Sequence, residues 1–233
     1  TMTYDILGRL LSRTRPLGQR ESFTYDENGN QLSHTDFNGR TTSFTYDSND
    51  RLISKNLSGG GVVTYVYSPS GLRTRAGGEL FAYDARGRLV SNQQVNGDII
   101  SYTYDASGNR IAMTTSQGTT TYTYNALNRL ATVTDGNGTT AYTYDPVGNL
   151  VTTTLPSGAI STNTYDNLNR LAQVVNSGPS GGISSYIYLL GPTGNRLQVT
   201  ESGAATTGRS VSYNYDSLYR LTREQVDEPG TAN

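Results

Sequence analysis

The feature that most constrains this chain is a short phrase that recurs along its whole length. The phrase is Tyr-Asp, two variable residues, Gly or Asn, and then Arg or Asn. Tyr25 and Tyr46 lie 21 residues apart, and Tyr104 and Tyr124 lie 20 residues apart. Self-similarity at a fixed period of this length is the signature of repeat architectures, in which each unit buries its apolar face only against its neighbours. We therefore expect a single array over residues 1–233, rather than one or two globular domains.

The Tyr-Asp pair is the anchor of each copy, and about eleven anchors tile the chain. The full anchors are Tyr4-Asp5, Tyr25-Asp26, Tyr46-Asp47, Tyr83-Asp84, Tyr104-Asp105, Tyr144-Asp145, Tyr165-Asp166 and Tyr215-Asp216. The degenerate copies are Tyr67-Ser68, Tyr124-Asn125 and Tyr188-Leu189.

A second aromatic residue usually stands two positions before the anchor, as in Phe23 before Tyr25. A spacing of two puts both rings on one face of a β-strand, and the Thr and Ser residues around them suit the opposite, polar face. The copy at Tyr165 has Asn163 in this place, so one rung of the aromatic ladder is missing. We expect the rings to stack on one another from strand to strand.

The residues after the anchor predict a tight turn. Asp at the first and Gly at the fourth position are preferences of a type I turn, in which the carboxylate accepts backbone N–H groups and Gly takes a positive φ. The fourth-position glycines include Gly8, Gly29, Gly87, Gly108 and Gly148. Asn128 and Asn169 replace this Gly, as expected of the residue that best tolerates left-handed geometry. Asp50 and Tyr219 fit less well, and we expect strain or a different turn there.

Each copy continues with an aliphatic residue, a run of Thr, Ser and Val, and a second, looser turn such as Asn96-Gly97. These are hairpin signals. A lone hairpin is marginal in water, so each one must pair with the next. The predicted fold is all-β: about eleven β-hairpin repeats forming one continuous antiparallel, curled sheet, part of a spiralling β-shell or solenoid.

Composition removes several kinds of chemistry. The chain has no Cys, one His, His34, and a formal charge of -1, which excludes disulfides, thiolate or multi-His metal sites and bulk attraction of nucleic acid. We expect His34 to be a surface residue near a turn. No apolar run approaches the roughly 18 residues of a membrane span. The sequence opens inside the repeated phrase, which suggests a piece of a longer protein whose targeting signal, if any, lies elsewhere.

The repeated polar residues have alternative interpretations as sites. The Asp ladder could supply catalytic carboxylate pairs or calcium ligands, but every Asp falls at the same turn position, so we expect turn caps. The Tyr stripe could bind sugars, although aromatic sugar-binding repeats rely on Trp and this chain has none. The Arg after the turn could bind an acidic cargo, but ion pairs or hydrogen bonds to the neighbouring unit fit the near-neutral charge better. We predict no catalytic residue, cofactor or metal, and a purely structural role for the anchors.

The pattern Tyr-x-Tyr-Asp-x-x-Gly-Arg-Leu at this spacing resembles the RHS or YD repeat of bacterial Rhs polymorphic toxins, Tc toxin shell components and animal teneurins. The clearest copies run from Tyr83 to Leu89 and from Tyr104 to Ile111. The resemblance implies a β-sheet shell wall that encloses a C-terminal toxin in the bacterial members. Those proteins close the shell with an Asp-Pro-x-Gly-Leu element and an autoproteolytic site. Here Asp145-Pro146 lies mid-array and in register with the other turns, so only the shell architecture carries over.

The resulting hypothesis is a non-enzymatic structural segment of a bacterial, secreted or cell-surface RHS/YD-repeat protein. Its expected partners are neighbouring repeats, other copies of itself and, in the full-length protein, a toxin cargo. The alternatives are an adhesive module that recognises glycans or receptors, and a repeat that stacks head to tail into a fibre through its open edge strands.

Overall fold

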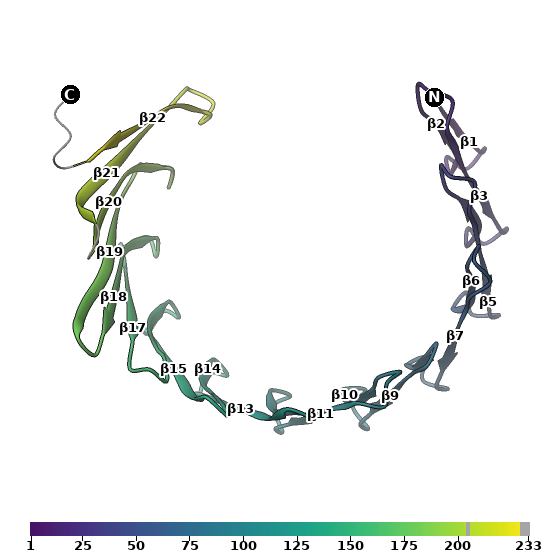
Figure 1. Ribbon diagram of the computed structural model, residues 1–233, viewed down its shortest axis with the longest axis horizontal. Helices are drawn as coiled ribbons and strands as arrows, with labels where there is room; N and C mark the ends of the chain where they lie inside the picture. Colours follow the sequence, from purple (N-terminus) through teal and green to yellow (C-terminus); the bar gives the residue numbers. More distant parts are fainter. Residues whose placement is uncertain (204–205, 229–233) are drawn as a thin grey trace. The chain divides into compact units, whose positions relative to one another are not determined.

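The structure, a computed structural model, describes residues 1–203 and 206–228. In this part of the chain there are 22 strands and no helix, so the all-β prediction is confirmed (Figure 1). Accordingly, no helix that could cross a membrane occurs there. The chain forms two compact units, Thr1–Tyr102 with Thr114–Ser116, and Thr103–Met113 with the described residues from Gln117 onward.

The strands are short and follow one another with only turns between them. In the first unit they are β1 (Met2–Tyr4), β2 (Leu10–Thr14), β3 (Arg20–Tyr25), β4 (Gln31–Thr35), β5 (Thr41–Tyr46), β6 (Leu52–Asn56), β7 (Val62–Tyr67), β8 (Arg73–Ala76), β9 (Glu79–Tyr83) and β10 (Leu89–Gln93). Residues of both units occur in β11 (Ile99–Tyr104) and β12 (Arg110–Thr115). The second unit continues with β13 (Gly118–Tyr124), β14 (Leu130–Asp135), β15 (Gly138–Tyr144), β16 (Leu150–Thr154), β17 (Ile160–Tyr165), β18 (Leu171–Gly178), β19 (Gly181–Leu190), β20 (Arg196–Gly203), β21 (Thr206–Tyr215) and β22 (Leu221–Asp227).

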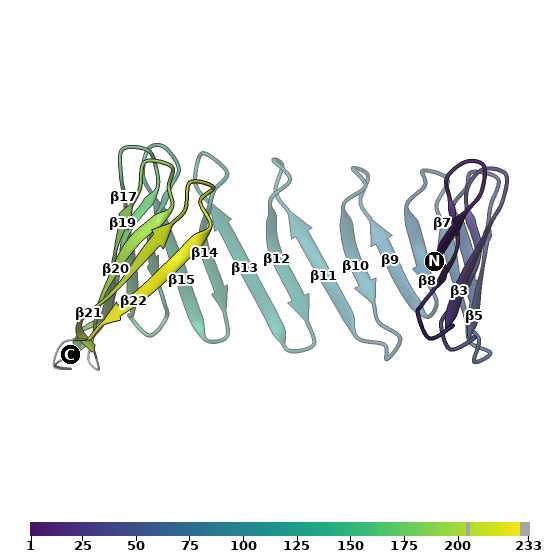
Figure 2. The ribbon, with the colours of Figure 1, turned by 90° about the horizontal axis from the view of Figure 1, so that it is seen from above.

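Each strand pairs with its neighbour in the sequence, and every pairing is antiparallel. This holds from β1 to β11 in the first unit. It also holds from β13 to β22 in the second unit. Within each unit the odd-numbered strands run toward one rim, where the anchor turns lie, and the even-numbered strands return (Figure 2). The predicted array of antiparallel hairpins is confirmed in each unit.

A β-bulge follows each anchor turn. Thr24 pairs with Ser33 and Tyr25 with Gln31, so Leu32 is an extra residue with no partner in the ladder. The same shift occurs at the equivalent place in the other hairpins, for example between Thr143 and Tyr144. Bulges bend a strand and increase its twist. Their regular recurrence gives each unit's sheet its curvature (Figure 1).

The sheet is a single layer, so almost nothing is fully buried. Along β7 the exposed and half-buried residues alternate, with Tyr65 and Tyr67 on the half-buried face. This confirms that the paired aromatic residues share a face. Among the described residues, the buried hydrophobic side chains are only Val199 and Val211, each 3% exposed. Contacts between adjacent repeats, rather than a central core, therefore hold the fold together.

The second turn of each unit is more regular than the looser turn expected. Several second turns make the same two backbone hydrogen bonds as the anchor turn, with Gly at the fourth position. They are the turns Arg15 to Gln19, Asp36 to Arg40, Leu57 to Gly61, Gln94 to Asp98 and Leu155 to Ala159. Each of these turns has its Gly at positive φ, the geometry that the hydrogen-bond pattern requires.

Candidate functional site: the joint between repeats

The anchor turn has one geometry throughout. At the first copy, the Gly8 N–H donates to the Asp5 carbonyl at 3.1 Å, and the Asp5 N–H donates to the Arg9 carbonyl at 3.0 Å. The Asp5 carboxylate caps the turn, because its Oδ1 accepts the N–H groups of Leu7 and Arg9 at 2.9 and 2.8 Å. This is a type I turn followed by one left-handed residue.

The remaining first-position residues lie in the same turn. They are Asp26, Asp47, Ser68, Asp84, Asp105, Asn125, Asp145, Asp166, Gly191 and Asp216. Asp50 and Tyr219 also make the standard fourth-position bond, at φ of 58° and 59°. The expectation of a different turn at these two residues was therefore wrong, and only the strain of a non-glycine side chain at positive φ remains.

The capping carboxyls have lowered pKa values. For Asp47 the largest cause is the side-chain hydrogen bond from Arg51. For Asp216 it is the backbone N–H of Arg220, followed by that residue's side chain. Hydrogen bonds to a carboxylate favour its charged form. These carboxyls are thus set to remain ionised, which suits a cap and does not suit a general acid.

The residue after the left-handed turn position closes the cap from outside. The Arg51 Nε donates to Asp47 Oδ2 at 2.7 Å. Where Asn replaces Arg, as at Asn149, its Nδ2 donates to Asp145 Oδ2 at 2.8 Å. Both oxygens of the carboxylate are therefore occupied within the repeat.

In eight of the copies the anchor tyrosine ties its repeat to the one before it through its hydroxyl group. The Tyr144 hydroxyl donates to the Leu130 carbonyl at 2.9 Å, and the Tyr25 hydroxyl donates to the Leu10 carbonyl at 3.0 Å. The equivalent bonds join Tyr46 to Gln31, Tyr67 to Leu52, Tyr83 to Arg73, Tyr124 to Arg110, Tyr165 to Leu150 and Tyr215 to Arg196. Sequence reasoning missed this bond. The signal was present, because the anchor is always Tyr while the position two residues earlier also accepts Phe and Asn.

The arginine after the turn reaches the next repeat, as predicted. The Arg129 Nη1 donates to the Asp145 carbonyl at 3.1 Å, and its guanidinium lies 4.7 Å from the centre of the Tyr144 ring. Arg9 makes the same two contacts, with Asp26 and Tyr25. Such cation–π contacts contribute about 0.5–1 kcal/mol at exposed sites.

We expected the aromatic rings to stack on one another from strand to strand, and this prediction was wrong for Tyr25, Tyr67 and Tyr144. At Tyr25, Tyr67 and Tyr144 the ring face meets a guanidinium group instead. The Arg side chain extends across the gap between repeats and occupies the space above the ring. In the copy where Asn163 replaces the second aromatic residue, its side chain also bonds to the preceding repeat, because its Nδ2 donates to the Leu150 carbonyl at 3.1 Å.

His34 lies near a turn, as expected, because β4 ends one residue later and the Asp36 turn follows. It is half-buried rather than fully exposed, stacked on Phe23 at 4.7 Å between ring centres, with its Nε2 3.5 Å from the Glu21 carboxylate. Glu21 is 6% exposed and also pairs with Arg13 at 2.6 Å.

Within the described residues no group of three or more His, Asp or Glu side chains is placed to hold a metal ion.

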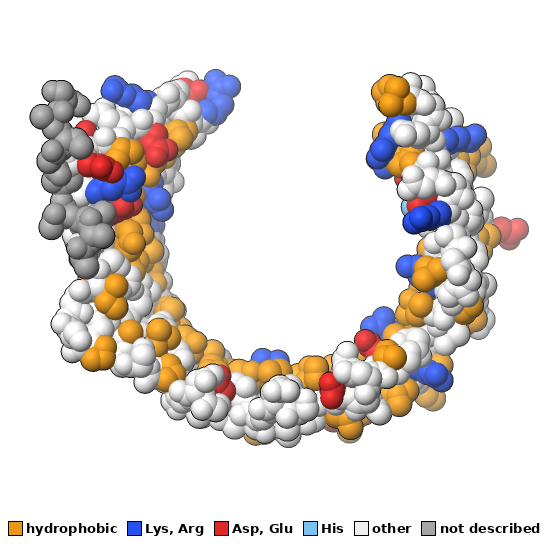
Figure 3. Space-filling model, in the orientation of Figure 1, with side chains coloured by type: hydrophobic (Ala, Val, Ile, Leu, Met, Phe, Trp, Pro, Cys, Tyr) orange, Lys and Arg blue, Asp and Glu red, His pale blue; other side chains and the backbone are white. Residues whose placement is uncertain are grey.

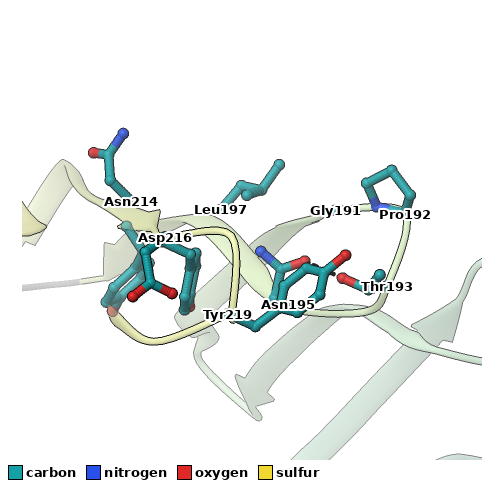
Figure 4. A pocket seen from close by; sticks show the side chains of 10 residues that line it. Gly191, Pro192, Thr193, Asn195, Leu197, Asn214, Asp216 and Tyr219 are labelled. Atoms are coloured by element: carbon teal, nitrogen blue, oxygen red, sulfur yellow. Dashed lines mark hydrogen bonds between the residues drawn. The ribbon is translucent and has the colours of Figure 1, made fainter. Parts of the chain in front are cut away.

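An open pocket of about 370 Å³ lies between the last two anchor turns (Figure 4). Its lining includes Asn195, Tyr213, Tyr215 and Tyr219, together with the Gly191 turn.

On the face seen in Figure 3, basic and acidic side chains are interspersed along the strands, with no continuous field of one sign.

Comparisons with known proteins agree with this geometry. The family model described as Teneurin YD-shell matches residues 1–119, and the RHS Repeat model matches residues 104–140, 124–160 and 144–183. A comparison with curated proteins gave no match.

Solved structures share the fold. The crystal structure of TcdB2-TccC3-Cdc42 has a TM-score of 0.73 and 17% identity, over 94% of this chain and 13% of that chain. The structure of TcdB2-TccC3-TEV gives the same values, and that of TcdB2-TccC3 has a TM-score of 0.57 and 14% identity, over 100% of this chain and 19% of that one. The chain thus spans a small part of the proteins that it resembles. Because the Teneurin YD-shell model covers more than half of it and RHS repeats follow, the chain belongs to the RHS/YD-repeat shell family.

Proposed function

We propose that this segment is a non-enzymatic part of a β-sheet shell wall, and that in a longer parent protein the shell encloses a toxin cargo. The observation that carries the proposal is the use made of the recurring polar groups. The anchor hydroxyl and the guanidinium hold neighbouring repeats together, and both carboxylate oxygens are occupied in capping the turn. Side chains committed in this way suit a wall and are not available for catalysis.

The parent context follows from the family. A secreted or cell-surface bacterial protein, with neighbouring repeats and a cargo as partners, fits a chain that spans 13% of a structural relative. The array over residues 1–233 would then be one stretch of that wall.

Two assays test the proposal. The purified chain should hydrolyse no glycoside, ester or phosphoester substrate, and turnover that disappears with Asp47→Asn or Asp145→Asn would contradict the non-enzymatic role. In protease digestion, a toxin domain mixed with this segment alone should be degraded as fast as the free domain, because a partial wall cannot enclose it. Protection by this segment alone would contradict that part of the proposal.

A second candidate is a glycan- or receptor-binding module, which the tyrosine-lined pocket favours. Tyr213, Tyr215 and Tyr219 line one cavity, and aromatic rings stack well on sugar faces. A glycan panel that changes tyrosine fluorescence in the native chain but not in Tyr219→Ala would support it. A third candidate is a fibre in which copies stack head to tail through the edge strands β1 and β22. Sedimentation that shows a monomer at high concentration would contradict it.

A further inference from the structure

The residue that follows each anchor turn correlates with the residue at the left-handed position of the next anchor turn. Numbering the turn from the residue after the anchor tyrosine, position 4 is the left-handed residue and position 5 is the Arg or Asn that follows it. An Arg at position 5 precedes a Gly at position 4 of the next copy: Arg9 and Gly29, Arg51 and Gly71, Arg88 and Gly108, Arg129 and Gly148, Arg170 and Gly194. An Asn at position 5 precedes a non-glycine residue: Asn30 and Asp50, Asn109 and Asn128, Asn149 and Asn169, Asn195 and Tyr219. These four residues are all the non-glycine residues with positive φ in the described chain.

The Arg joint accounts for the glycine at Gly29, Gly148 and Gly194, whereas a Cβ on Gly71 or Gly108 would meet nothing within 4 Å. The Arg129 guanidinium extends over the next turn and donates to the Asp145 carbonyl at 3.1 Å. A Cβ placed on Gly148 would stand 3.5 Å from Arg129 Nη1, and one placed on Gly29 would stand 3.8 Å from Arg9 Nη1. Those distances admit a Cβ in van der Waals contact but leave no room for further side-chain atoms in that direction. The remaining copy, with Leu72 at position 5, also precedes a glycine, and Leu72 would lie 3.7 Å from a Cβ on Gly87.

The Asn joint explains the exceptions. Asn is too short to reach the next backbone carbonyl, and the side chain at position 4 fills the gap. The Asn109 Nδ2 donates to Asn128 Oδ1 at 2.9 Å, and the Asn149 Nδ2 donates to Asn169 Oδ1 at 3.0 Å. Asn30 bonds Asp50 in the same way, at 2.6 Å. Each hydrogen bond offsets the strain of a non-glycine residue at positive φ.

We propose that position 5 is a specificity determinant, which selects the turn that can pack against it, and that the exposed edge at β22 therefore accepts a hairpin whose turn carries glycine. The last position 5 is Arg220, whose side chain is 74% exposed, whereas those of Arg9, Arg51 and Arg170 are 27%, 31% and 28% exposed. Its Nε donates to Asp216, as in the other copies. Within the described part of the chain, its Nη groups have no acceptor from a following turn.

The partner that fits this edge is a further YD hairpin of the Gly type. Every residue of β22 is exposed, so its outer edge can extend the ladder. Leu221 occupies the place of Leu10 and Leu130, whose carbonyls accept the next anchor hydroxyl. An incoming turn would place its tyrosine hydroxyl at the Leu221 carbonyl and its first-position carbonyl at the Arg220 guanidinium. A glycine at position 4 would keep that guanidinium unobstructed.

A double-mutant cycle in the full chain tests the selection rule. Asn109→Arg should lower the midpoint of urea unfolding when Asn128 is present, and should leave or raise it in the Asn128→Gly background. The matched cycle runs in the opposite direction, with Arg129→Asn and Gly148→Asn. Additive effects in both cycles would overturn the rule, because residues that act independently show no coupling.

A binding experiment tests the exposed edge. A fluorescent peptide of residues 136–155, which contains β15, β16 and Gly148, is titrated with the full chain, alongside the same peptide with Gly148→Asn. We expect the glycine peptide to bind at least about fivefold more tightly, a difference of ~1 kcal/mol, and the preference to reverse with Arg220→Asn. Equal affinities, no binding by either peptide, or a preference that is unchanged by Arg220→Asn would overturn docking at β22.

Discussion

A single hydroxyl group distinguishes the anchor tyrosine from the aromatic residue two positions before it. Both rings lie on the same face of a strand, but only the anchor reaches a backbone carbonyl in the preceding repeat. A buried or half-buried carbonyl that loses its donor is left poorly satisfied. The anchor therefore needs a hydroxyl group, whereas the position two residues earlier holds Tyr or Phe in most copies and Asn163 or Met2 in others.

Tyr144→Phe should lower the free energy of unfolding by about 0.5–1.5 kcal/mol, the usual contribution of one hydrogen bond. Tyr142→Phe is the matched control on the same strand, because no hydrogen bond of the Tyr142 hydroxyl occurs within the described chain, and it should be nearly neutral. Urea denaturation followed by circular dichroism measures both. Equal losses for the two variants would show that the anchor bond contributes nothing specific.

Tyr219 is the least suitable of the four left-handed non-glycine residues, since within the described chain its side chain makes no hydrogen bond to Asn195 across the pocket they share. Tyr219→Asn should stabilise the chain by about 1 kcal/mol, because Asn tolerates this conformation and supplies an acceptor for Asn195. Tyr219→Gly removes the strain without adding the acceptor and should gain less. Thermal unfolding ranks the three proteins, and a native chain that is more stable than Tyr219→Asn would contradict the account.

At the scale of the element, the anchor turn pairs both oxygens of its capping carboxylate. The carboxylate accepts two backbone N–H groups through one oxygen and a side-chain donor through the other, and its pKa is lowered as a result. Asn125 shows which part is indispensable. It accepts the N–H groups of Leu127 and Arg129 through its carbonyl oxygen, so the cap survives without the charge.

The lowered carboxyl pKa values predict loss of stability in acid. A carboxyl whose pKa is lower in the folded state contributes stability that is complete above its unfolded pKa of about 4, and that is lost as the pH falls through the folded value. The free energy of unfolding should therefore fall between about pH 5 and pH 2. Asp47→Asn should reduce the slope of this fall, because Asn binds no proton in that range. An unchanged slope would show that Asp47 does not contribute to the linkage.

At the scale of the whole molecule, each unit is an array whose stability comes from successive joints. With one layer of sheet and few buried side chains, no central core fixes the number of repeats. Stability should then be close to a sum of repeat and joint contributions. Such an array tolerates the loss of a repeat if the new neighbours match.

Two deletions of equal length test this. Removing residues 129–148 joins Asn128 to Asn149. Asn149 then occupies position 5 of the joined turn and still precedes Asn169. Removing residues 136–155 instead sets Arg129 before Asn169, a mismatch. The first deletion should keep the β-sheet circular dichroism and most of the native unfolding midpoint, and the second should unfold earlier. The opposite order would contradict repeat matching as a determinant of assembly.

The sequence alone was sufficient for most of the local structure, although the second turns and the turns at Asp50 and Tyr219 are more regular than it predicted. The period predicts the number of hairpins, the spacing of the rings assigns the strand faces, and Asp at the first turn position predicts its cap, because each of these depends on residues close in the chain. The tertiary structure alone decided the joints. The hydroxyl of Tyr144 meets a carbonyl 14 residues earlier, and the Arg129 guanidinium takes the ring face that was assigned to another ring. These contacts depend on the register between neighbouring strands, which the bulge after each anchor shifts by one residue. A local pattern does not encode that shift, so only the paired strands reveal which groups meet.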